Sequence, residues 1–166
     1  MVMTTGLINY HDKHYTPKHI SKYIVDYFQP KGKILEPCRG DGSFMEYLPE
    51  DTLWCEIDQG RDFFDFQEKV DWIITNPPYS ILTKWMEHCF QLSDNVVLLI
   101  PISKLFSSNP RLKMVHEYGG ISDMIIFGTG RSIGIDLGFP MGAIKFSRGW
   151  MNGTNIEWYK ETNNDL

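Results

Sequence analysis

Short, continuous apolar runs limit the folds that this chain can adopt. The runs VVLLI (residues 96–100) and DMIIF (residues 123–127) lack the polar alternation of a strand with one face in water, so we expect both faces to be buried. A sheet buried on both faces needs helices on both sides, and its strands are then mostly parallel. Expected strands are residues 33–36, 53–57, 71–75, 95–100, 121–127 and 142–146, and expected helices are residues 17–28, 43–48, 80–92 and 110–118. The sequence therefore predicts an open α/β fold, whose ligands bind beyond the carboxyl ends of the strands.

The two ends of the chain add a helix and a hairpin to this prediction. Apolar side chains recur every three or four positions in residues 17–28, which places them on one helical face. Thr16 offers a hydroxyl that can cap this helix, and Pro17 suits its first position. Residues 150–159 contain the turn signal Asn152-Gly153 and are expected to form a small hairpin at a sheet edge.

Length and composition predict one globular domain over residues 1–166. Apolar residues make up 42% of the chain and charged residues 22%, as in ordinary globular proteins. Cys38, Cys55 and Cys89 are too few and too scattered for a zinc site or a disulfide framework, so we expect no metal and a reducing cytoplasm. The first residues lack the apolar core of a signal peptide, and no apolar run approaches the roughly 20 residues that span a bilayer. We therefore expect neither export nor a membrane role.

A glycine turn follows the first expected strand, within residues 34–44. Gly40 and Gly42 allow the backbone to approach a ligand closely, and Glu36 at the strand end can receive a cation or a hydroxyl. Taken alone, the two glycines fit an ordinary strand-to-helix turn at least as well.

Acidic residues follow the second expected strand. A carboxylate at the tip of this strand is where a nucleoside-binding fold hydrogen-bonds a ribose. Glu56 is the better candidate because it alternates in phase with Trp54 along one face of the strand. Asp58 fits a solvated turn.

The third segment, residues 71–79, carries the sharpest signal. Two successive prolines cannot donate hydrogen bonds to a strand ladder, so the strand must end at Thr75 or Asn76. The side chain of Asn76, the carbonyl of Pro77 and the ring of Tyr79 are then fixed at the mouth of the strand. The alternative is a stiff connector without a function. A functional site is favoured, because this motif ends a strand and two other candidate segments follow the preceding strands.

Together these segments resemble the S-adenosylmethionine-dependent amino methyltransferases, and most closely their DNA adenine-specific branch. Residues 35–44 look like the loop that holds the methionine end of the cofactor, and residues 76–79 (NPPY) look like the catalytic tetrapeptide. Residues 15–17 (YTP) resemble the extra cofactor motif of the branch in which that motif comes first. The resemblance implies a Rossmann-like class I methyltransferase sheet, mostly parallel with an antiparallel last strand, and S-adenosyl-L-methionine as the cofactor.

The resemblance also assigns roles to single residues. The catalytic residues that it implies are Asn76, Pro77, Pro78 and Tyr79. The cofactor-binding residues that it implies are Tyr15, Thr16, Glu36, Pro37, Gly40, Gly42, Glu56, Ile57, Asp62 and Phe63. Asp62-Phe63 looks like the acid–aromatic pair that contacts the cofactor adenine, and Asp65-Phe66 offers the same pair three residues later. If the Asn76 side-chain oxygen and the Pro77 carbonyl accept the two N–H bonds of an adenine amine, its lone pair points at the sulfonium methyl, so orientation and electrostatics carry the rate.

The sequence departs from the family pattern in three places. Arg39 stands where the family usually has a small residue, so its guanidinium either reaches the cofactor carboxylate or points to solvent. Glu56 and Asp62 are too close in sequence for a parallel crossover of about a dozen residues, which predicts a sheet that is reduced at its strand 2/3 edge. About twenty residues follow Phe146, so we expect a single catalytic domain without a separate target-recognition domain.

Target recognition is then expected from loops, from a partner protein, or not at all. The best loop is residues 128–138, whose four glycines suggest a mobile connector and whose Arg131 is the candidate for substrate contact. A flexible surface loop without a target is the alternative.

The leading hypothesis is an enzyme that methylates the N6 amine of adenine in DNA after the base is flipped out of the duplex, where Tyr79 can stack on it. The alternatives are methylation of an RNA base or a protein glutamine amide, or a cofactor-binding module without turnover. The net charge of −5 does not oppose DNA binding, because it divides unevenly. Residues 34–71 have three basic and eleven acidic residues, whereas residues 72–148 have seven basic and five acidic. An enzyme that touches DNA with one face remains compatible with this distribution.

Overall fold

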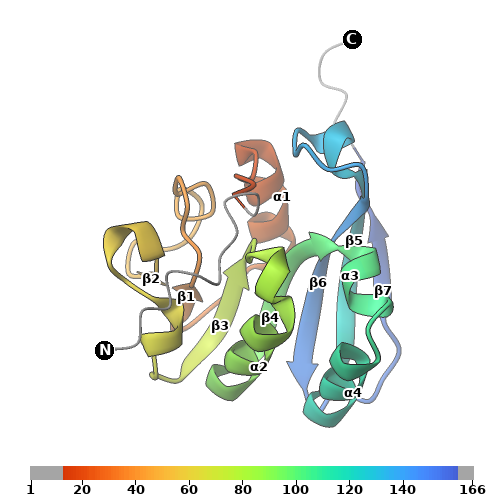
Figure 1. The fold of residues 1–166 in the computed structure, drawn as a ribbon. Coiled ribbons are helices and arrows are strands. Elements are labelled where there is room, and N and C mark those ends of the chain that lie inside the picture. Colours follow the sequence, from red (N-terminus) through yellow and green to blue (C-terminus); the bar gives the residue numbers. More distant parts are fainter. Residues whose placement is uncertain (1–12, 161–166) are drawn as a thin grey trace.

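The structure is a computed structural model that describes residues 13–160, in which one seven-stranded sheet forms the centre (Figure 1). The strands are β1 (Ile34–Glu36), β2 (Leu53–Trp54), β3 (Val70–Thr75), β4 (Ser93–Pro101), β5 (Gly119–Thr129), β6 (Pro140–Arg148) and β7 (Asn155–Trp158). They lie in the order β2-β1-β3-β4-β6-β5-β7, and among these described strands only β6 runs antiparallel to its neighbours. The predicted α/β sheet is confirmed, and the strand predicted over residues 142–146 is the antiparallel one.

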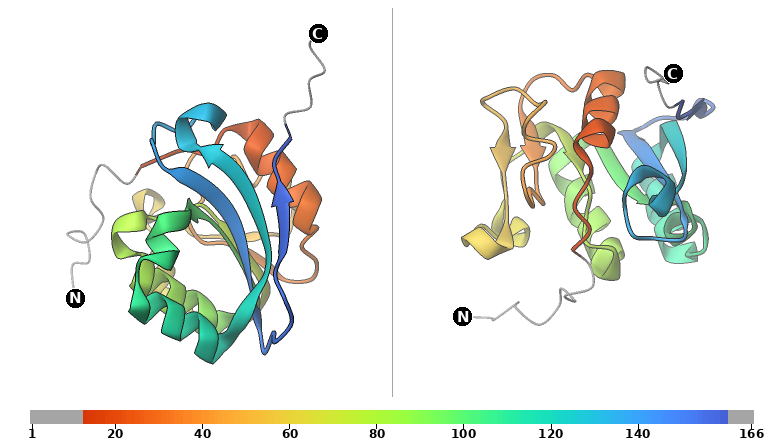
Figure 2. Two further views of the ribbon diagram at one scale, coloured as in Figure 1. Left: turned by 90° about the vertical axis from the view of Figure 1, so that its right-hand side faces the viewer. Right: turned by 90° about the horizontal axis from the view of Figure 1, so that it is seen from above.

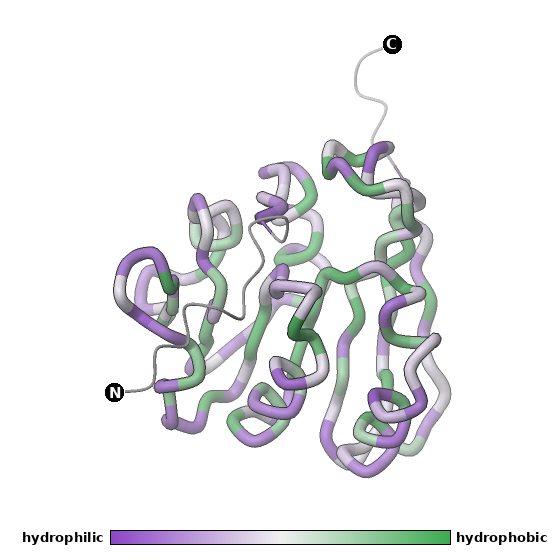
Figure 3. The backbone as a smooth tube through the Cα atoms, in the orientation of Figure 1, coloured by the Kyte–Doolittle hydropathy of each residue, from purple (hydrophilic) through white to green (hydrophobic). Residues whose placement is uncertain are grey.

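Helices cover both faces of this sheet. α1 (Lys18–Phe28) lies on one face, whereas α2 (Leu82–Leu92) and α4 (Asn109–Tyr118) lie on the other (Figure 2). In β4 every residue from Val96 to Pro101 is buried. Hydrophobic residues are concentrated in the central strands (Figure 3). The apolar runs are continuous because neither face of the central strands meets water.

The order of the strands fixes where a ligand can bind. The chain leaves β1 toward β2 on one side and later returns to β3 on the other side of β1. Open α/β sheets bind their ligands where the strand order reverses in this way. The glycine loop after β1, the turn after β2 and the Asn-Pro-Pro-Tyr segment after β3 all start at this edge of the sheet.

The edge of the sheet at β2 is reduced, as predicted. Between β2 and β3 the described chain forms only the short 3₁₀ turns η2 (Ile57–Gln59) and η3 (Phe63–Asp65). β2 itself ends at Trp54, three residues earlier than predicted, because Glu56 caps the η2 turn and draws the chain away from β1.

Two local predictions near the glycine loop are wrong. Residues 43–48 form hydrogen-bonded turns instead of a helix. The N–H groups of Tyr47 and Leu48 both donate to the Phe44 carbonyl, and Pro49 has no N–H with which to continue a helix. The hydroxyl of Thr16 does not cap α1, whose N-cap residue is Pro17 and has no side-chain cap. The Thr16 hydroxyl has another partner, described below.

The predicted C-terminal hairpin is also wrong, because residues 155–158 form a single strand parallel to β5. The chain reaches this position by crossing the start of β5. Gly120 makes the crossing possible, since a Cβ atom there would lie 2.8 Å from the Trp150 carbonyl oxygen. The short helix α3 (Ile102–Phe106), directly after β4, was not predicted.

Candidate active site

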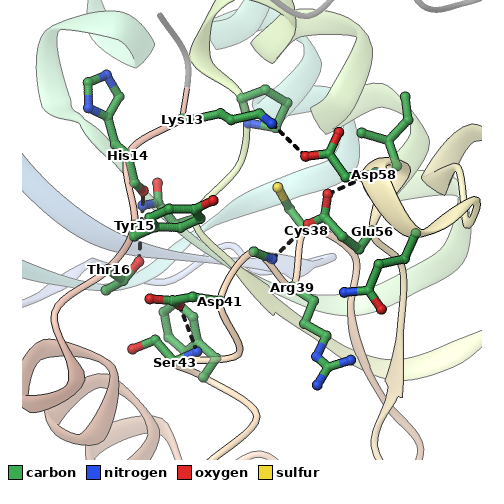
Figure 4. Close-up of a pocket in the computed structure, with 16 residues that line it drawn as sticks. Lys13, His14, Tyr15, Thr16, Cys38, Arg39, Asp41, Ser43, Glu56 and Asp58 are labelled. Carbon is green, nitrogen blue, oxygen red and sulfur yellow. Dashed lines mark hydrogen bonds and ion pairs between the residues drawn. The ribbon is translucent and has the colours of Figure 1, made fainter. Parts of the chain in front are cut away.

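A cavity of about 290 Å³ opens at the carboxyl ends of β1, β2 and β3 (Figure 4). Its wall comes from four segments that are distant in sequence: the stretch before α1, the glycine loop, the turn after β2 and the segment after β3. The lining residues are 13–16, 38–41, 43, 44, 56–59, 76 and 78. The structure therefore brings together the three segments that the sequence singled out, along with the residues before α1.

The backbone of the glycine loop is shaped by Gly40 and Gly42, whose φ angles are +55° and +89°. These values lie in the left-handed region, which glycine enters without steric cost. A Cβ atom on Gly40 would lie 3.2 Å from the Tyr15 ring. Tyr15 therefore packs directly against the loop, and any larger residue at position 40 would push the two apart.

Glu36 at the end of β1 holds the start of this loop through a hydrogen bond. Its side chain is fully buried, and Oε1 accepts a hydrogen bond of 2.9 Å from the Cys38 N–H. Burial raises the pKa of Glu36 to about 8, against smaller opposite effects of the Thr75 hydroxyl and the Cys38 amide. Glu36 is thus held in its protonated form near neutral pH, and neither Glu36 nor Pro37 lines the cavity.

Glu56 connects the turn after β2 to the glycine loop. Its Oε2 accepts a hydrogen bond of 2.7 Å from the Gly40 N–H, and its Oε1 accepts one of 3.2 Å from the Asp58 N–H. Each carboxylate oxygen has a second lone pair, so Glu56 can also accept hydrogen bonds from a ligand. Lys13 forms an ion pair of 2.5 Å with Asp58, which ties the stretch before α1 to the turn after β2.

Acidic groups outnumber basic groups on the cavity wall. The charged residues that line the cavity are Asp41, Glu56 and Asp58 together with Lys13 and Arg39. The wall therefore has one negative charge in excess and complements a ligand with a net positive charge.

Asn76 forms the part of the wall beyond β3, and its amide group makes three hydrogen bonds. Nδ2 donates to the His14 carbonyl oxygen at 2.8 Å and to Thr16 Oγ1 at 3.0 Å. Oδ1 accepts a hydrogen bond of 2.6 Å from the Tyr79 hydroxyl. An amide oxygen has two lone pairs, so Oδ1 keeps one for a further donor.

The ring of Tyr79 is covered on one side by His14. The two rings are nearly parallel, with an interplanar angle of 16° and centroids 6.0 Å apart. Tyr79 is 5% exposed. A planar ligand that stacks on this side of Tyr79 must therefore displace His14.

Solved structures of similar fold include proteins that are described as a modification subunit or as methyltransferases. A protein described as the modification subunit of a type I restriction enzyme from Vibrio vulnificus is 14% identical over 93% of this chain, with a TM-score of 0.65. A protein described as a class I S-adenosylmethionine-dependent methyltransferase from Listeria monocytogenes is 13% identical over 96% of this chain, with a TM-score of 0.69. This chain has the class I methyltransferase fold.

The likeness extends to a protein described as an RNA methyltransferase from Pyrococcus horikoshii, which is 14% identical over 82% of this chain with a TM-score of 0.56. The chain spans 49% of the length of the Vibrio modification subunit, 70% of the Listeria protein and 87% of the Pyrococcus protein. No family model and no curated protein sequence matches the chain.

The methyltransferase fold does not bring every predicted cofactor residue to the cavity. Phe63 is 2% exposed and packs against Trp85 and His88, with ring centroids 4.5 and 4.6 Å away. Asp62 and its alternative Asp65 both line a separate cavity of about 380 Å³. Residues that sequence reasoning had not selected, Asp58 and Gln59 among them, line the main cavity instead.

His88 is a structural residue that sequence reasoning missed. Its Nε2 lies 3.1 Å from the Phe63 carbonyl oxygen and 2.9 Å from that of Phe66, so it holds the η3 turn against α2. His88 follows the buried Trp85 by three residues, which places both on the same helical face. This spacing is the sequence signal that could have predicted an inward-facing His88.

Arg131 also lies away from the cavity. Its Nε is 3.3 Å from Asp136 Oδ1 within the same exposed loop. This loop is folded on itself, because Ile133 and Ile135 are 3% and 2% exposed. A Cβ atom on Gly134 would lie 3.1 Å from Pro17 Cγ, so the loop packs on the residue that precedes α1.

Arg39 lines the cavity, but its side chain extends away from Asp58 (Figure 4). The guanidinium carbon of Arg39 lies 4.6 Å from the centroid of the Trp54 ring, and that of Arg61 lies 3.7 Å from the same ring. The Arg39 guanidinium thus stacks on Trp54. The sequence had suggested that it reaches the cofactor carboxylate or points to solvent.

Among residues 13–160, no cluster of three or more His, Cys, Asp or Glu side chains could hold a metal ion. In the same part of the chain, no helix has the length and apolar character that crossing a membrane requires.

Proposed function

We propose that this chain is a methyltransferase that transfers a methyl group from S-adenosyl-L-methionine to the N6 amine of adenine in DNA. The observation that carries the proposal is the Asn76 amide, which is held at the wall of the cavity with one oxygen lone pair left over. The class I methyltransferase fold supports it, because the cavity lies where that fold reverses its strand order.

The charge of the cavity wall fits the proposed cofactor. The volume of about 290 Å³ lies just below the roughly 300–1,000 Å³ of typical small-molecule sites. S-adenosyl-L-methionine has one net positive charge, which complements the acidic excess of the wall. When bound, it supplies a methyl group activated by the sulfonium. Glu56 would hold the ribose hydroxyls with its remaining lone pairs, Gly40 would admit the methionine end beside Tyr15, and Ile57 would pack against the cofactor adenine.

The chain's part in the transfer is to orient a weak nucleophile. The lone pair of an adenine amine is delocalised into the ring, and acceptors for both N–H bonds direct it out of the ring plane. Asn76 Oδ1 and the Pro77 carbonyl are the proposed acceptors. The new N–C bond forms as the S–C bond breaks, and the proton lost from nitrogen passes to solvent. Orientation and electrostatics of this kind can supply most of a rate enhancement.

DNA is the proposed target because the Vibrio protein of similar fold is described as the modification subunit of a restriction enzyme. An adenine amine inside a duplex is out of reach, so the base must be flipped into the site. Tyr79 would stack on the flipped base once His14 has moved aside. Arg131 lies away from the cavity, and the basic residues that line it, Lys13 and Arg39, pair with Asp58 and stack on Trp54. We therefore also propose a separate specificity partner.

The test is transfer of labelled methyl groups by the purified chain to four substrates. These are duplex DNA that contains adenine, a duplex built only from G·C pairs, RNA of matched sequence, and a protein mixture. We expect label in the adenine-containing duplex alone, recovered as N6-methyladenine after digestion to nucleosides.

Each other outcome contradicts part of the proposal. Equal labelling of the G·C duplex would exclude adenine as the target, and labelling of RNA or protein alone would move the activity to that substrate. RNA is included because the Pyrococcus protein of similar fold is described as an RNA methyltransferase. Cofactor binding without transfer to any of the four would indicate a binding module.

A further inference from the structure

The hydroxyl of Thr16 forms a hydrogen bond with Asn76 in the segment after β3, although Thr16 lies close to the start of α1. Thr16 is 6% exposed. The helix that follows takes Pro17 as its N-cap and receives no side-chain cap. The Thr16 Oγ1 instead accepts a hydrogen bond of 3.0 Å from Asn76 Nδ2 (Figure 4). Because Pro17 takes the N-cap position, Thr16 lies one residue before it, and its hydroxyl bonds Asn76 instead of the helix.

One hydrogen bond of Asn76 fixes which end of its amide is the nitrogen, because the His14 carbonyl can only accept, whereas the Thr16 and Tyr79 hydroxyls can donate or accept. Both N–H bonds of Nδ2 are used, one by Thr16 Oγ1 and one by the His14 carbonyl oxygen at 2.8 Å. The Tyr79 hydroxyl donates to Oδ1 at 2.6 Å. Rotating the amide by 180° would place Oδ1 against the His14 carbonyl, acceptor against acceptor, and would turn Nδ2 to the Tyr79 hydroxyl.

We propose that Thr16 is a positioning residue, which holds the Asn76 side chain in place so that its Oδ1 is presented to the target amine. This inference rests on the proposed function, and it gives Thr16 a role different from the cofactor contact that the family resemblance implies. Thr16 acts through Asn76 and does not itself need to touch either substrate. The His14 carbonyl, which can only accept, sets which end of the amide is the nitrogen, and the Lys13–Asp58 ion pair ties the stretch that contains His14 and Thr16 to the far side of the cavity.

The test compares Thr16→Val, which keeps the shape of the side chain but removes the hydroxyl, with Thr16→Ser, which restores the hydroxyl. For Thr16→Val we expect kcat to fall about tenfold, the effect of losing one orienting hydrogen bond, with less than a twofold change in the Kd of S-adenosyl-L-methionine. Thr16→Ser should stay within about twofold of the unsubstituted chain in both quantities. Thr154→Val is the matched control, because Thr154 is exposed, lies outside the cavity and also loses a hydroxyl hydrogen bond, the one to the Ile121 carbonyl oxygen.

The side-chain amide protons of Asn76 provide a readout that needs no catalysis. In NMR spectra of the chain, Thr16→Val should shift one of the two Asn76 amide protons upfield and speed its exchange with water, and Thr16→Ser should restore both. An unchanged pair of signals in Thr16→Val would overturn the inference.

The remaining outcomes separate this inference from the proposed function. A loss of cofactor affinity at unchanged kcat would make Thr16 a cofactor contact and overturn the positioning role. An equal loss in Thr16→Val and Thr16→Ser would make side-chain shape the cause and overturn it too. If the unsubstituted chain labels none of the four substrates while the Asn76 signals respond as expected, the proposed function fails, and with it the catalytic meaning of the contact.

Discussion

A single buried carboxyl, Glu36, links the stability of the glycine loop to pH. Burial raises its pKa to about 8, so the folded chain keeps a proton that the unfolded chain releases above about pH 4. The free energy of unfolding should therefore fall as the pH rises through this window, by up to about 1.4 kcal/mol per pH unit from this group.

Glu36→Gln tests this linkage, because glutamine stays neutral and retains an oxygen for the Cys38 N–H. Urea unfolding at several values between about pH 5 and pH 8 should show the substituted chain gaining stability relative to the unsubstituted chain as the pH rises. A constant difference over this range would show that Glu36 is charged in the folded state.

For single residues, the sequence indicates which ones lie at the cavity better than it indicates which residues they form hydrogen bonds with. Turn glycines and strand-end polar groups leave a local signal, and three residues that were selected from it, Gly40, Glu56 and Asn76, line one cavity. The bond from Asn76 to Thr16 joins residues 60 positions apart, and no local pattern encodes it. The predicted roles of these residues toward cofactor and target stay predictions.

Among the elements, the η3 turn depends on α2 for its place. His88 on α2 serves the carbonyl oxygens of Phe63 and Phe66, and its ring contacts Phe63. His88→Ala should lower the free energy of unfolding by about 1–3 kcal/mol, because two carbonyl groups lose their donor. His116→Ala, on the exposed face of α4, should change it by less than about 0.5 kcal/mol. Equal effects in denaturant titrations would show that His88 does not hold the turn.

The elements that were predicted well are those with long apolar patterns. β4, β5 and α2 contain many buried residues, and each of their ends lies within two residues of the predicted position. Short elements were predicted less well: residues 43–48 form turns instead of a helix, and β7 was mistaken for half of a hairpin. Its parallel pairing depends on a crossing at Gly120, which is a property of the assembled sheet and not of residues 150–159.

At the scale of the whole molecule, the topology places the two halves of the proposed reaction side by side. The acidic segment 34–71 supplies the glycine loop and Glu56, and the next strand supplies Asn76. The stretch before α1 joins them, since it pairs with Asp58 through Lys13 and with Asn76 through Thr16. The central claim is that this junction binds cofactor on one side and orients an amine on the other.

The most direct test of that claim measures methyl transfer and cofactor affinity together in Asn76→Ala, with Asn152→Ala at an exposed position as control. We predict that transfer to adenine-containing duplex DNA falls about 100-fold or more in Asn76→Ala, as when an oriented hydrogen-bonding group is removed from an active site. The Kd of S-adenosyl-L-methionine, measured by calorimetry, should change by less than about threefold, or under 0.7 kcal/mol. Unchanged transfer, or a loss of cofactor binding that accounts for all of the lost transfer, would contradict the claim.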